Sequence, residues 1–406
     1  MRRLLILTAL IGGALMTAPA VKAQTLTIGF TTSETGKLNA DSKPQLLGFE
    51  LWRDQVNANG GIKVGGSSYK VALKYYDDQS SASRVQQLYS RLILQDNADF
   101  LFSPYSSGLT ATAAVVSEQF SKIMITTGAA EGKTYTLGNK SLFQLYTPAK
   151  DYLKSALDVI KANSPNARIA LTYSNNGFST AVAKGALASA KSMGLNVVFD
   201  EAYATDTTDF GPIINKIVAS GATVLIGGGH YADGSTLAKQ LFDKKVPLKF
   251  ISLLVAPDNP SFAQLGQAAL GVTVPSQWEH TVGYKPDFGP TSAEFAKAFE
   301  AKYGVQPGYH AAGGYTAGMI LQHAIEQAGS IKGEAVTKAL NSMDATTFFG
   351  RINFSSEPGN HGLQIGHDMV LAQWQQGNDG KLGIEVVWPK EAQTSALVYP
   401  LTRFAN

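Results

Sequence analysis

The sequence predicts an α/β protein of two domains, each with a largely parallel β-sheet covered by helices. Short apolar runs of strand length alternate with longer runs of helical spacing from residue 26 onward, as in right-handed βαβ units. The same alternation restarts after residue 150 and continues for a similar length. About 380 residues follow an expected leader, which is more than one hydrophobic core usually organises.

The first 23 residues have the features of a cleaved secretory signal peptide. Arg2 and Arg3 precede an apolar run at 4–16, and a small-residue cleavage signal ends at Ala23. We therefore expect a periplasmic protein. Because the leader also carries Lys22, its removal lowers the formal net charge from +3 to 0. The charge gives no support for a nucleic-acid partner or an anionic membrane surface.

The individual elements are predicted from periodicity and from the residues that end each run. In the first half we expect strands at 26–30, 71–75, 100–102 and 123–125, with helices at 44–56, 81–94 and from Ser106 or Ser107 to 120. In the second half we expect strands at 168–173, 196–199, 222–226 and 249–251, with helices at 152–162, 179–193, 210–219 and 235–242. Helices at 291–303, 310–327 and 333–343 follow, and then strands at 367–374 and 382–388.

A polar turn after the strand at 100–102 is the central candidate for a binding site. Ser106 or Ser107 stands where a helix N-cap belongs, and Gly108 is expected to let another group approach the backbone closely. Free N–H groups at a helix start, together with the positive end of the helix dipole, favour a carboxylate or another acceptor. The alternative is that the serines only cap their own helix.

The other loops that follow strands share a composition with this turn. In open α/β sheets, ligands bind beyond the carboxyl ends of the strands. The relevant loops are 126–132, 174–178, 227–233 and 253–257, which contain small, hydroxyl-bearing and aromatic residues and few charges. A cleft lined in this way is suited to a small and partly apolar solute.

The sequence lacks the usual signs of catalysis. It has no cysteine, no two of its six histidines stand three or four residues apart, and no zinc-protease, nucleophile-elbow, Walker A or dinucleotide motif occurs. We expect no metal, no cofactor and no enzymatic activity, with an unusual secreted hydrolase as an alternative. Asp77 and Asp78 are interpreted as a solvated turn rather than an acid or metal pair, and His230 as either a packing residue or a ligand contact.

The order of several short segments resembles a known family. These segments are Ile28-Gly29-Phe30, 56–62, Tyr76-Asp77-Asp78, Tyr105-Ser106-Ser107, 124–130, Gly314-Tyr315-Thr316-Ala317 and Trp374-Gln375. Together they span nearly all of the chain after the leader. In this order the chain resembles the type I periplasmic solute-binding proteins of ABC transporters, in the leucine-binding-protein-like group that takes branched-chain amino acids and amides.

The resemblance implies two Rossmann-like lobes with parallel sheets, joined by a hinge of three crossovers near 145–149, 274–277 and 350–353. Lobe 1 would comprise 24–147 and 276–350, and lobe 2 would comprise 148–275 and 351–406. It further implies a monomer that holds a small solute between the lobes and delivers it to the membrane permease of an ABC importer. A ligand sensor for a receptor is the alternative function.

The resemblance also implies which residues contact the solute, taken position by position. They are the serine turn Tyr105, Ser106 and Ser107; the second turn Gly128, Ala129 and Ala130; the aromatic Phe178; and His230 or Tyr231 in the glycine-rich turn. Ala130 stands where the family usually has a hydroxyl. The family's amino-acid binders place a glutamate after the strand that ends at 251–252, whereas this chain has Leu254 in an apolar run. The expected solute is an amino acid, or a carboxylate or aromatic acid that lacks a paired ammonium, and the apolar run favours the second class because a buried unpaired ammonium is costly.

Overall fold

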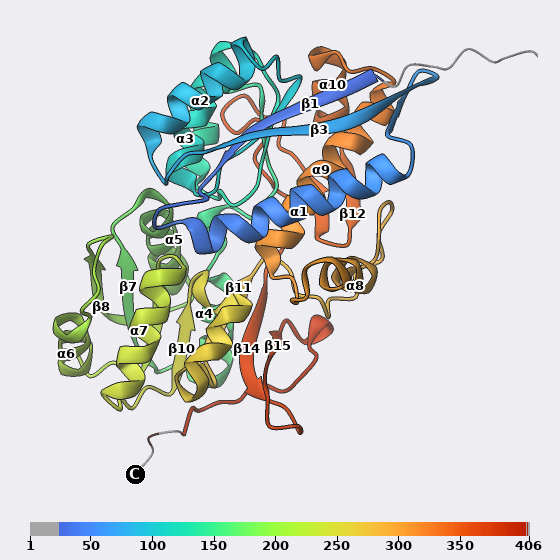
Figure 1. Ribbon diagram of the computed structural model, residues 1–406. Coiled ribbons are helices and arrows are strands. Elements are labelled where there is room, and N and C mark those ends of the chain that lie inside the picture. Colours follow the sequence, from blue (N-terminus) through green and yellow to red (C-terminus); the bar gives the residue numbers. More distant parts are fainter. Residues whose placement is uncertain (1–23, 403, 405–406) are drawn as a thin grey trace, which may run out of the picture.

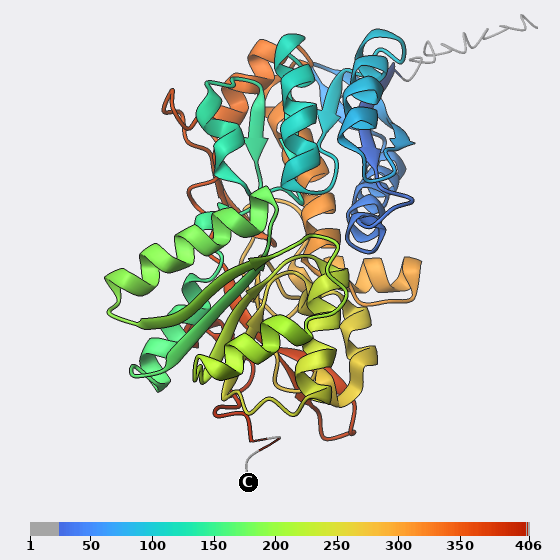
Figure 2. The same ribbon diagram turned by 90° about the vertical axis from the view of Figure 1, so that its left-hand side faces the viewer.

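The structure of the protein, a computed structural model, describes residues 24–402 and 404. Two β-sheets flanked by helices form two lobes, one above the other (Figures 1 and 2). The predicted α/β class and the two-lobe architecture are confirmed. The predicted leader, residues 1–23, lies outside the described residues.

Lobe 1 is built on a six-stranded sheet with the order β2-β3-β1-β4-β5-β6. Its strands are β1 (Gln24–Thr32), β2 (Ile62–Val64), β3 (Ser67–Asp77), β4 (Phe100–Phe102), β5 (Met124–Thr126) and β6 (Leu142–Gln144). Neighbouring strands are parallel except β2, which is antiparallel to β3. The helices are α1 (Asn39–Ala58), α2 (Ala82–Leu94), α3 (Ser107–Gln119), α9 (Tyr309–Ala328) and α10 (Gly333–Asn341).

Both faces of the lobe 1 sheet are covered by helices. Phe100 and Phe102 belong to the hydrophobic cluster that includes α1 and α9, whereas Leu101 belongs to the cluster of α2 and α3. Alternate residues of a strand point to opposite faces, so β4 is buried on both sides. A Cβ at Gly48 of α1 would lie 2.1 Å from the carbonyl oxygen of Ala311, so a glycine is needed where α1 crosses α9.

Lobe 2 is built on a seven-stranded sheet with the order β15-β14-β11-β10-β9-β7-β8. Its strands are β7 (Arg168–Ser174), β8 (Asn196–Tyr203), β9 (Val224–Gly228), β10 (Phe250–Leu253), β11 (Thr273–Ser276), β14 (Val370–Gln376) and β15 (Leu382–Trp388). The five strands from β8 to β11 are parallel, and β14 and β15 are added antiparallel at one edge. The helices are α4 (Lys154–Asn163), α5 (Gly177–Ser192), α6 (Gly211–Ala219) and α7 (Tyr231–Asp243).

Short 3₁₀ helices lie at η1 (Gly132–Leu137), η2 (Ala149–Asp151) and η5 (Lys390–Ala392), and the other elements lie between α7 and β14 in the chain. Helix α8 (Ser292–Tyr303) and the hairpin β12 (Asp344–Thr347) and β13 (Gly350–Asn353) complete the fold. Short 3₁₀ helices η3 (Ala256–Asp258) and η4 (Pro260–Ala268) follow β10. Strands β2, β6, β11, β12 and β13 were not predicted, because a run of three or four residues shows too little alternation to be recognised unless, as in β4 and β5, it is strongly apolar.

Three chain crossings join the lobes, and hydrogen bonds connect the three to one another. The Thr147 N–H donates to Gln277 Oε1 at 3.0 Å, and His367 Nε2 donates to the Gln277 carbonyl at 2.8 Å. The Thr147 hydroxyl donates to the His367 carbonyl at 2.9 Å. Thr147 and Gln277 lie in the predicted first and second crossovers at 145–149 and 274–277, and His367 belongs to the third crossing.

Contacts made by residues 354–362 favour a third crossing later in the chain than the one expected at 350–353. The Gln144 N–H donates to the Gly362 carbonyl at 2.7 Å, and the rings of Phe143 and Phe354 lie 5.2 Å apart. Residues 354–362 therefore stay beside the lobe 1 sheet after the hairpin. We propose that lobe 1 continues to about residue 366, with the third crossover at 366–369.

The pair Asp77 and Asp78 differs from the solvated turn expected from the sequence. Asp78 is fully buried and accepts hydrogen bonds from the hydroxyls of Thr31 at 2.8 Å and Ser33 at 2.6 Å. It also accepts from the Ser80 N–H at 2.9 Å. The carboxylate has a structural role: it joins the loops that follow β1 and β3.

Candidate functional site

The carboxyl ends of the strands in both sheets face each other across the junction between the lobes. A cavity of about 530 Å³ opens there, and we call it the cleft. Its lining includes Ser106, Ser107, Ser174, Asn176, Phe178 and His230, together with the charged residues Lys37, Asp206 and Asp233. Four of the predicted site residues, Ser106, Ser107, Phe178 and His230, therefore share one cavity formed by both lobes.

The serine turn is held in a conformation that L-residues seldom adopt. Ser106 has φ 85° and is the N-cap of α3, where its side chain accepts a hydrogen bond from the Leu109 N–H at 3.3 Å. The predicted N-cap is confirmed. A Cβ on Gly108 would meet no atom of the chain within 4 Å, so no other part of the protein approaches this glycine closely, and Gly108 faces the open cleft.

The close approach occurs instead at Gly128, in the second predicted turn. Gly128 has φ +65°, and a Cβ there would lie 2.2 Å from Gln45 Oε1 and 2.7 Å from the Tyr105 ring. Its carbonyl accepts the Ser106 N–H at 3.1 Å. The two predicted turns are thus hydrogen-bonded to each other, and Gly128 allows them to pack closely.

Ser107 makes a second connection between the same two turns. Its Oγ accepts hydrogen bonds from the N–H groups of Ala130 and Glu131, both at 3.1 Å. Ala129 and Ala130 are buried and do not line the cleft. A hydroxyl that accepts two hydrogen bonds still has one hydrogen to donate, so Ser107 retains a donor for a solute.

A chain of aromatic rings connects the two lobes beside the cleft; Phe178 and His230 line the cleft, whereas Tyr105 and Tyr152 are buried behind it. The Tyr105 hydroxyl of lobe 1 is hydrogen-bonded to His230 Nδ1 of lobe 2 at 3.2 Å. The His230 ring stacks on Phe178, with centroids 5.8 Å apart and planes at 27°, and Phe178 meets the edge of Tyr152 at 5.1 Å. The structure therefore brings Tyr105, Phe178 and His230 together, as the resemblance implied.

The structure separates the neighbours His230 and Tyr231, between which the sequence could not decide. His230 lines the cleft, whereas Tyr231 lines a different cavity on the other side of the α7 N-terminus. Leu254 is fully buried in the hydrophobic core and does not line the cleft. The Leu254 side chain therefore does not contact a solute in the cleft directly, and it can influence binding only through the residues packed against it.

The electrostatics of the cleft favour a hydrogen-bond acceptor. The N-termini of α3 from lobe 1 and of α5 and α7 from lobe 2 all open onto the cleft. Free N–H groups and dipoles at these ends favour negative charge. The Asp233 carboxylate at the start of α7 already accepts the His230 N–H and the Tyr203 hydroxyl, each at 2.7 Å.

Three buried titratable residues beside the cleft were not predicted as site residues. The Asp41 carboxylate of α1 accepts the Tyr231 N–H of α7 at 3.4 Å, and burial raises the pKa of Asp41 despite the nearby His230 and His310. Asp258 lies 3.7 Å from His310 Nδ1 and accepts the Tyr309 N–H at 3.1 Å. Burial raises the pKa of Asp258 as well.

These residues could not have been found from the sequence, because each lies near its partner only in the folded chain. In the sequence, Asp41 is a polar residue just before the helix predicted at 44–56, and His310 is the first residue of the helix predicted at 310–327. Tyr105 packs on His310 with ring centroids 5.0 Å apart. We call Asp41, Tyr105 and His310 the dividing wall, because the cleft lies on one side and the second cavity on the other.

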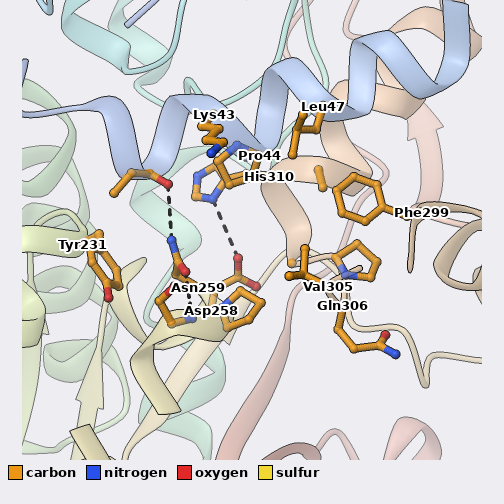
Figure 3. Close-up of a pocket in the computed structure, with 16 residues that line it drawn as sticks. Lys43, Pro44, Leu47, Tyr231, Asp258, Asn259, Phe299, Val305, Gln306 and His310 are labelled. Carbon is orange, nitrogen blue, oxygen red and sulfur yellow. Dashed lines mark hydrogen bonds and ion pairs between the residues drawn. The ribbon is translucent and has the colours of Figure 1, made fainter. Parts of the chain in front are cut away.

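The second cavity, which we call the side pocket, has a volume of about 270 Å³ (Figure 3). Its lobe 1 wall comes from α1, the end of α8 and the segment that leads into α9, and its lobe 2 wall from Tyr231, η3 and η4. The Asn259 amide donates to the Ala40 carbonyl at 3.3 Å across the junction. The side pocket thus exists only while the two lobes are in contact here.

The described residues contain no group of three or more metal-ligating side chains that could hold a metal ion. In the same part of the chain, no helix has the length and apolar character needed to cross a membrane.

The chain is similar to known proteins along most of its length. Residues 25–381 match the model of a family described as periplasmic binding protein. A Leu/Ile/Val-binding protein homologue of Brucella melitensis is 22% identical over 97% of this chain and 99% of its own length.

Two solved structures are similar to this one along nearly their whole length. A branched-chain amino acid transporter substrate-binding protein of Streptococcus pneumoniae, in complex with isoleucine, has a TM-score of 0.74 at 22% identity and covers 90% of this chain and 100% of its own. A solute-binding protein of R. palustris in complex with benzoate has a TM-score of 0.72 at 18% identity, with 92% and 99% covered. At these identities the likeness shows the fold.

Proposed function

This chain belongs to the periplasmic binding protein family, and we propose that it is the substrate-binding component of an ABC importer. In this proposal it is secreted by cleavage of residues 1–23 and acts as a monomer in the periplasm. It captures a small organic solute in the cleft and delivers it to the membrane permease.

One observation carries the proposal: helix N-termini from both lobes converge on a single interlobe cavity. The ends of α3, α5 and α7 all line the cleft, so a carboxylate there would interact with both lobes at once. Such a solute favours the closed arrangement, because only that arrangement supplies donors from both sides. Closure also removes water and strengthens each hydrogen bond to the solute.

The residues of the cleft favour a carboxylate solute without an ammonium group. The Asp233 carboxylate is already bonded to His230 and Tyr203, and Asp206 at the rim is exposed to solvent. No glutamate follows β10, where Leu254 is buried instead. The similar proteins hold isoleucine in one case and benzoate in another, so the residues of each cleft decide the solute.

The ring of Phe178 is the surface against which the body of the solute would pack. It stacks on His230 and is held by Tyr152, so its orientation is set before a solute arrives. A preorganised aromatic wall lowers the entropy cost of binding. We therefore propose aromatic or branched aliphatic monocarboxylates as solutes, with amino acids as the less favoured class.

A thermal-shift screen against amino acids, amides and aromatic and aliphatic acids tests this proposal, because a bound solute raises the melting temperature. We expect monocarboxylates to cause the largest shifts in melting temperature. In calorimetric titration with the best of these solutes, Phe178→Ala should lower the affinity at least tenfold. Leu94→Ala, an exposed residue of α2, is the matched control and should bind normally. Tight leucine binding with no affinity for aromatic or aliphatic acids would contradict the proposed solute class.

A further inference from the structure

We propose that the side pocket is a second ligand site of this chain, which takes a small monocarboxylate with an apolar body. The carboxylate lies between Lys43 and His310, and the body packs against the apolar walls. This site is separate from the cleft, and its existence does not depend on the solute that the cleft binds.

The walls of the side pocket define the body of the ligand. Most of its lining is apolar, and the residues that supply this surface are Pro44, Leu47, Phe299, Val305, Pro307 and Pro260. A volume of about 270 Å³ lies at the small end of the range for ligand pockets, so a single ring or a short branched chain fits. Figure 3 shows Leu47, Phe299 and Val305 on the same side of the cavity.

The charged groups of the side pocket define the head of the ligand. Lys43 is the only lysine or arginine that lines it, and no ion pair involves Lys43 among the described residues. The only acid is Asp258, whose carboxylate is buried, accepts the Tyr309 N–H and faces His310 Nδ1. Asp258 therefore orients the imidazole, and the Nε2 atom of His310 remains for a ligand.

The position of the side pocket couples it to the cleft. Its ligand would touch both lobes, so it would stabilise the same closed arrangement that a cleft solute stabilises. His310 of the side pocket packs on Tyr105, and the Tyr105 hydroxyl bonds His230 of the cleft. Because linkage is reciprocal, each ligand should tighten the binding of the other.

Benzoate is the probe for this site, and benzamide is its neutral analogue. In calorimetric titration of the full chain after leader removal, we expect Lys43→Gln to weaken one benzoate-binding step at least fivefold. Leu47→Trp, which fills the pocket, should abolish that step, with Val305→Trp as a second filling variant should the first not fold. Lys239→Gln is the control, because Lys239 is an exposed lysine of α7 that lines neither cavity.

The position of the probe is checked by a crystal structure of the benzoate complex. We expect its carboxylate within hydrogen-bond distance of Lys43 Nζ or His310 Nε2. The proposal is overturned by benzamide binding as tightly as benzoate, by filling variants that leave every binding step unchanged, or by binding at crystal concentration only. Loss of cleft binding in Phe178→Ala, with this step retained, separates the two sites.

Discussion

The cleft and the side pocket share the dividing wall, but the residues on its two sides offer different chemistry to a ligand. The cleft is lined by helix N-termini, hydroxyls, an amide and Lys37, whereas the side pocket is lined mainly by prolines and other apolar side chains, with Lys43 and His310. Many donors of the cleft are backbone N–H groups at the ends of parallel strands, so the fold itself supplies them. The ligand preference of the side pocket depends on its side chains, so a single substitution should alter it more than a single substitution alters the ligand preference of the cleft.

The largest effect is expected from a substitution on the cleft side, at Gly128. Gly128→Ala places a Cβ at φ +65° and 2.2 Å from Gln45 Oε1, which should cost roughly 2–5 kcal/mol of unfolding free energy. Urea denaturation measures this loss. Gly108→Ala is the matched control: nothing lies within 4 Å of its Cβ in α3, so it should be neutral or stabilise by up to about 1 kcal/mol. Equal losses in the two variants would refute the packing argument.

The second largest effect is expected from Ser107, whose hydroxyl joins the two turns of lobe 1 by hydrogen bonds. Ser107→Ala removes the acceptor for the N–H groups of Ala130 and Glu131, which should cost roughly 1–3 kcal/mol. Affinity for the cleft solute should fall by about tenfold or more, while the benzoate step of the side pocket is retained. Ser83→Ala, at an exposed position of α2, serves as control. A variant that keeps full cleft affinity would show that Ser107 only joins the two turns and does not contact the solute.

A smaller, pH-dependent effect is expected at the dividing wall, from Asp41→Asn. Because burial raises the Asp41 pKa above 3.8, the folded protein binds this proton more tightly than the unfolded chain does. The stabilisation from this group is therefore present below pH 3.8 and is lost as the pH rises through the folded pKa. Asparagine keeps an oxygen acceptor for the Tyr231 N–H.

The comparison of wild type and Asp41→Asn is made by calorimetric melting at pH 4 and pH 7. We expect the variant to gain more in melting temperature, relative to wild type, at pH 7 than at pH 4. A gain that does not depend on pH would mean that Asp41 does not titrate differently in the folded and unfolded states.

The smallest effect is expected for a charged residue of α7 that lies outside both cavities. Lys239 and Asp243 pair at 2.6 Å on α7, with 61% and 53% of their side chains exposed. Water screens such a pair, so Lys239→Gln should change the unfolding free energy by no more than about 0.5 kcal/mol. A larger change in chemical denaturation would show that the surface charges of α7, and not only its first turn, contribute to the lobe contact.

Much of the fold was predictable from the sequence because it depends on neighbours along the chain. The alternation of strands and helices follows from apolar periodicity, and the Ser106 N-cap follows from residue type at a helix start. The grouping of Ser107, Phe178 and His230 in one cleft follows from the rule that the carboxyl ends of parallel strands share an edge.

The tertiary structure decided what depends on residues far apart in the chain. Asp41 meets the Tyr231 N–H across 190 positions, and the sequence shows no local pattern that would pair them. The same holds for the burial of Asp78, for the pairing of Asp258 with His310, and for the assignment of His230 and Tyr231 to different cavities. Periodicity specifies which face of an element is apolar, but only the packing of whole lobes determines which polar groups meet between them.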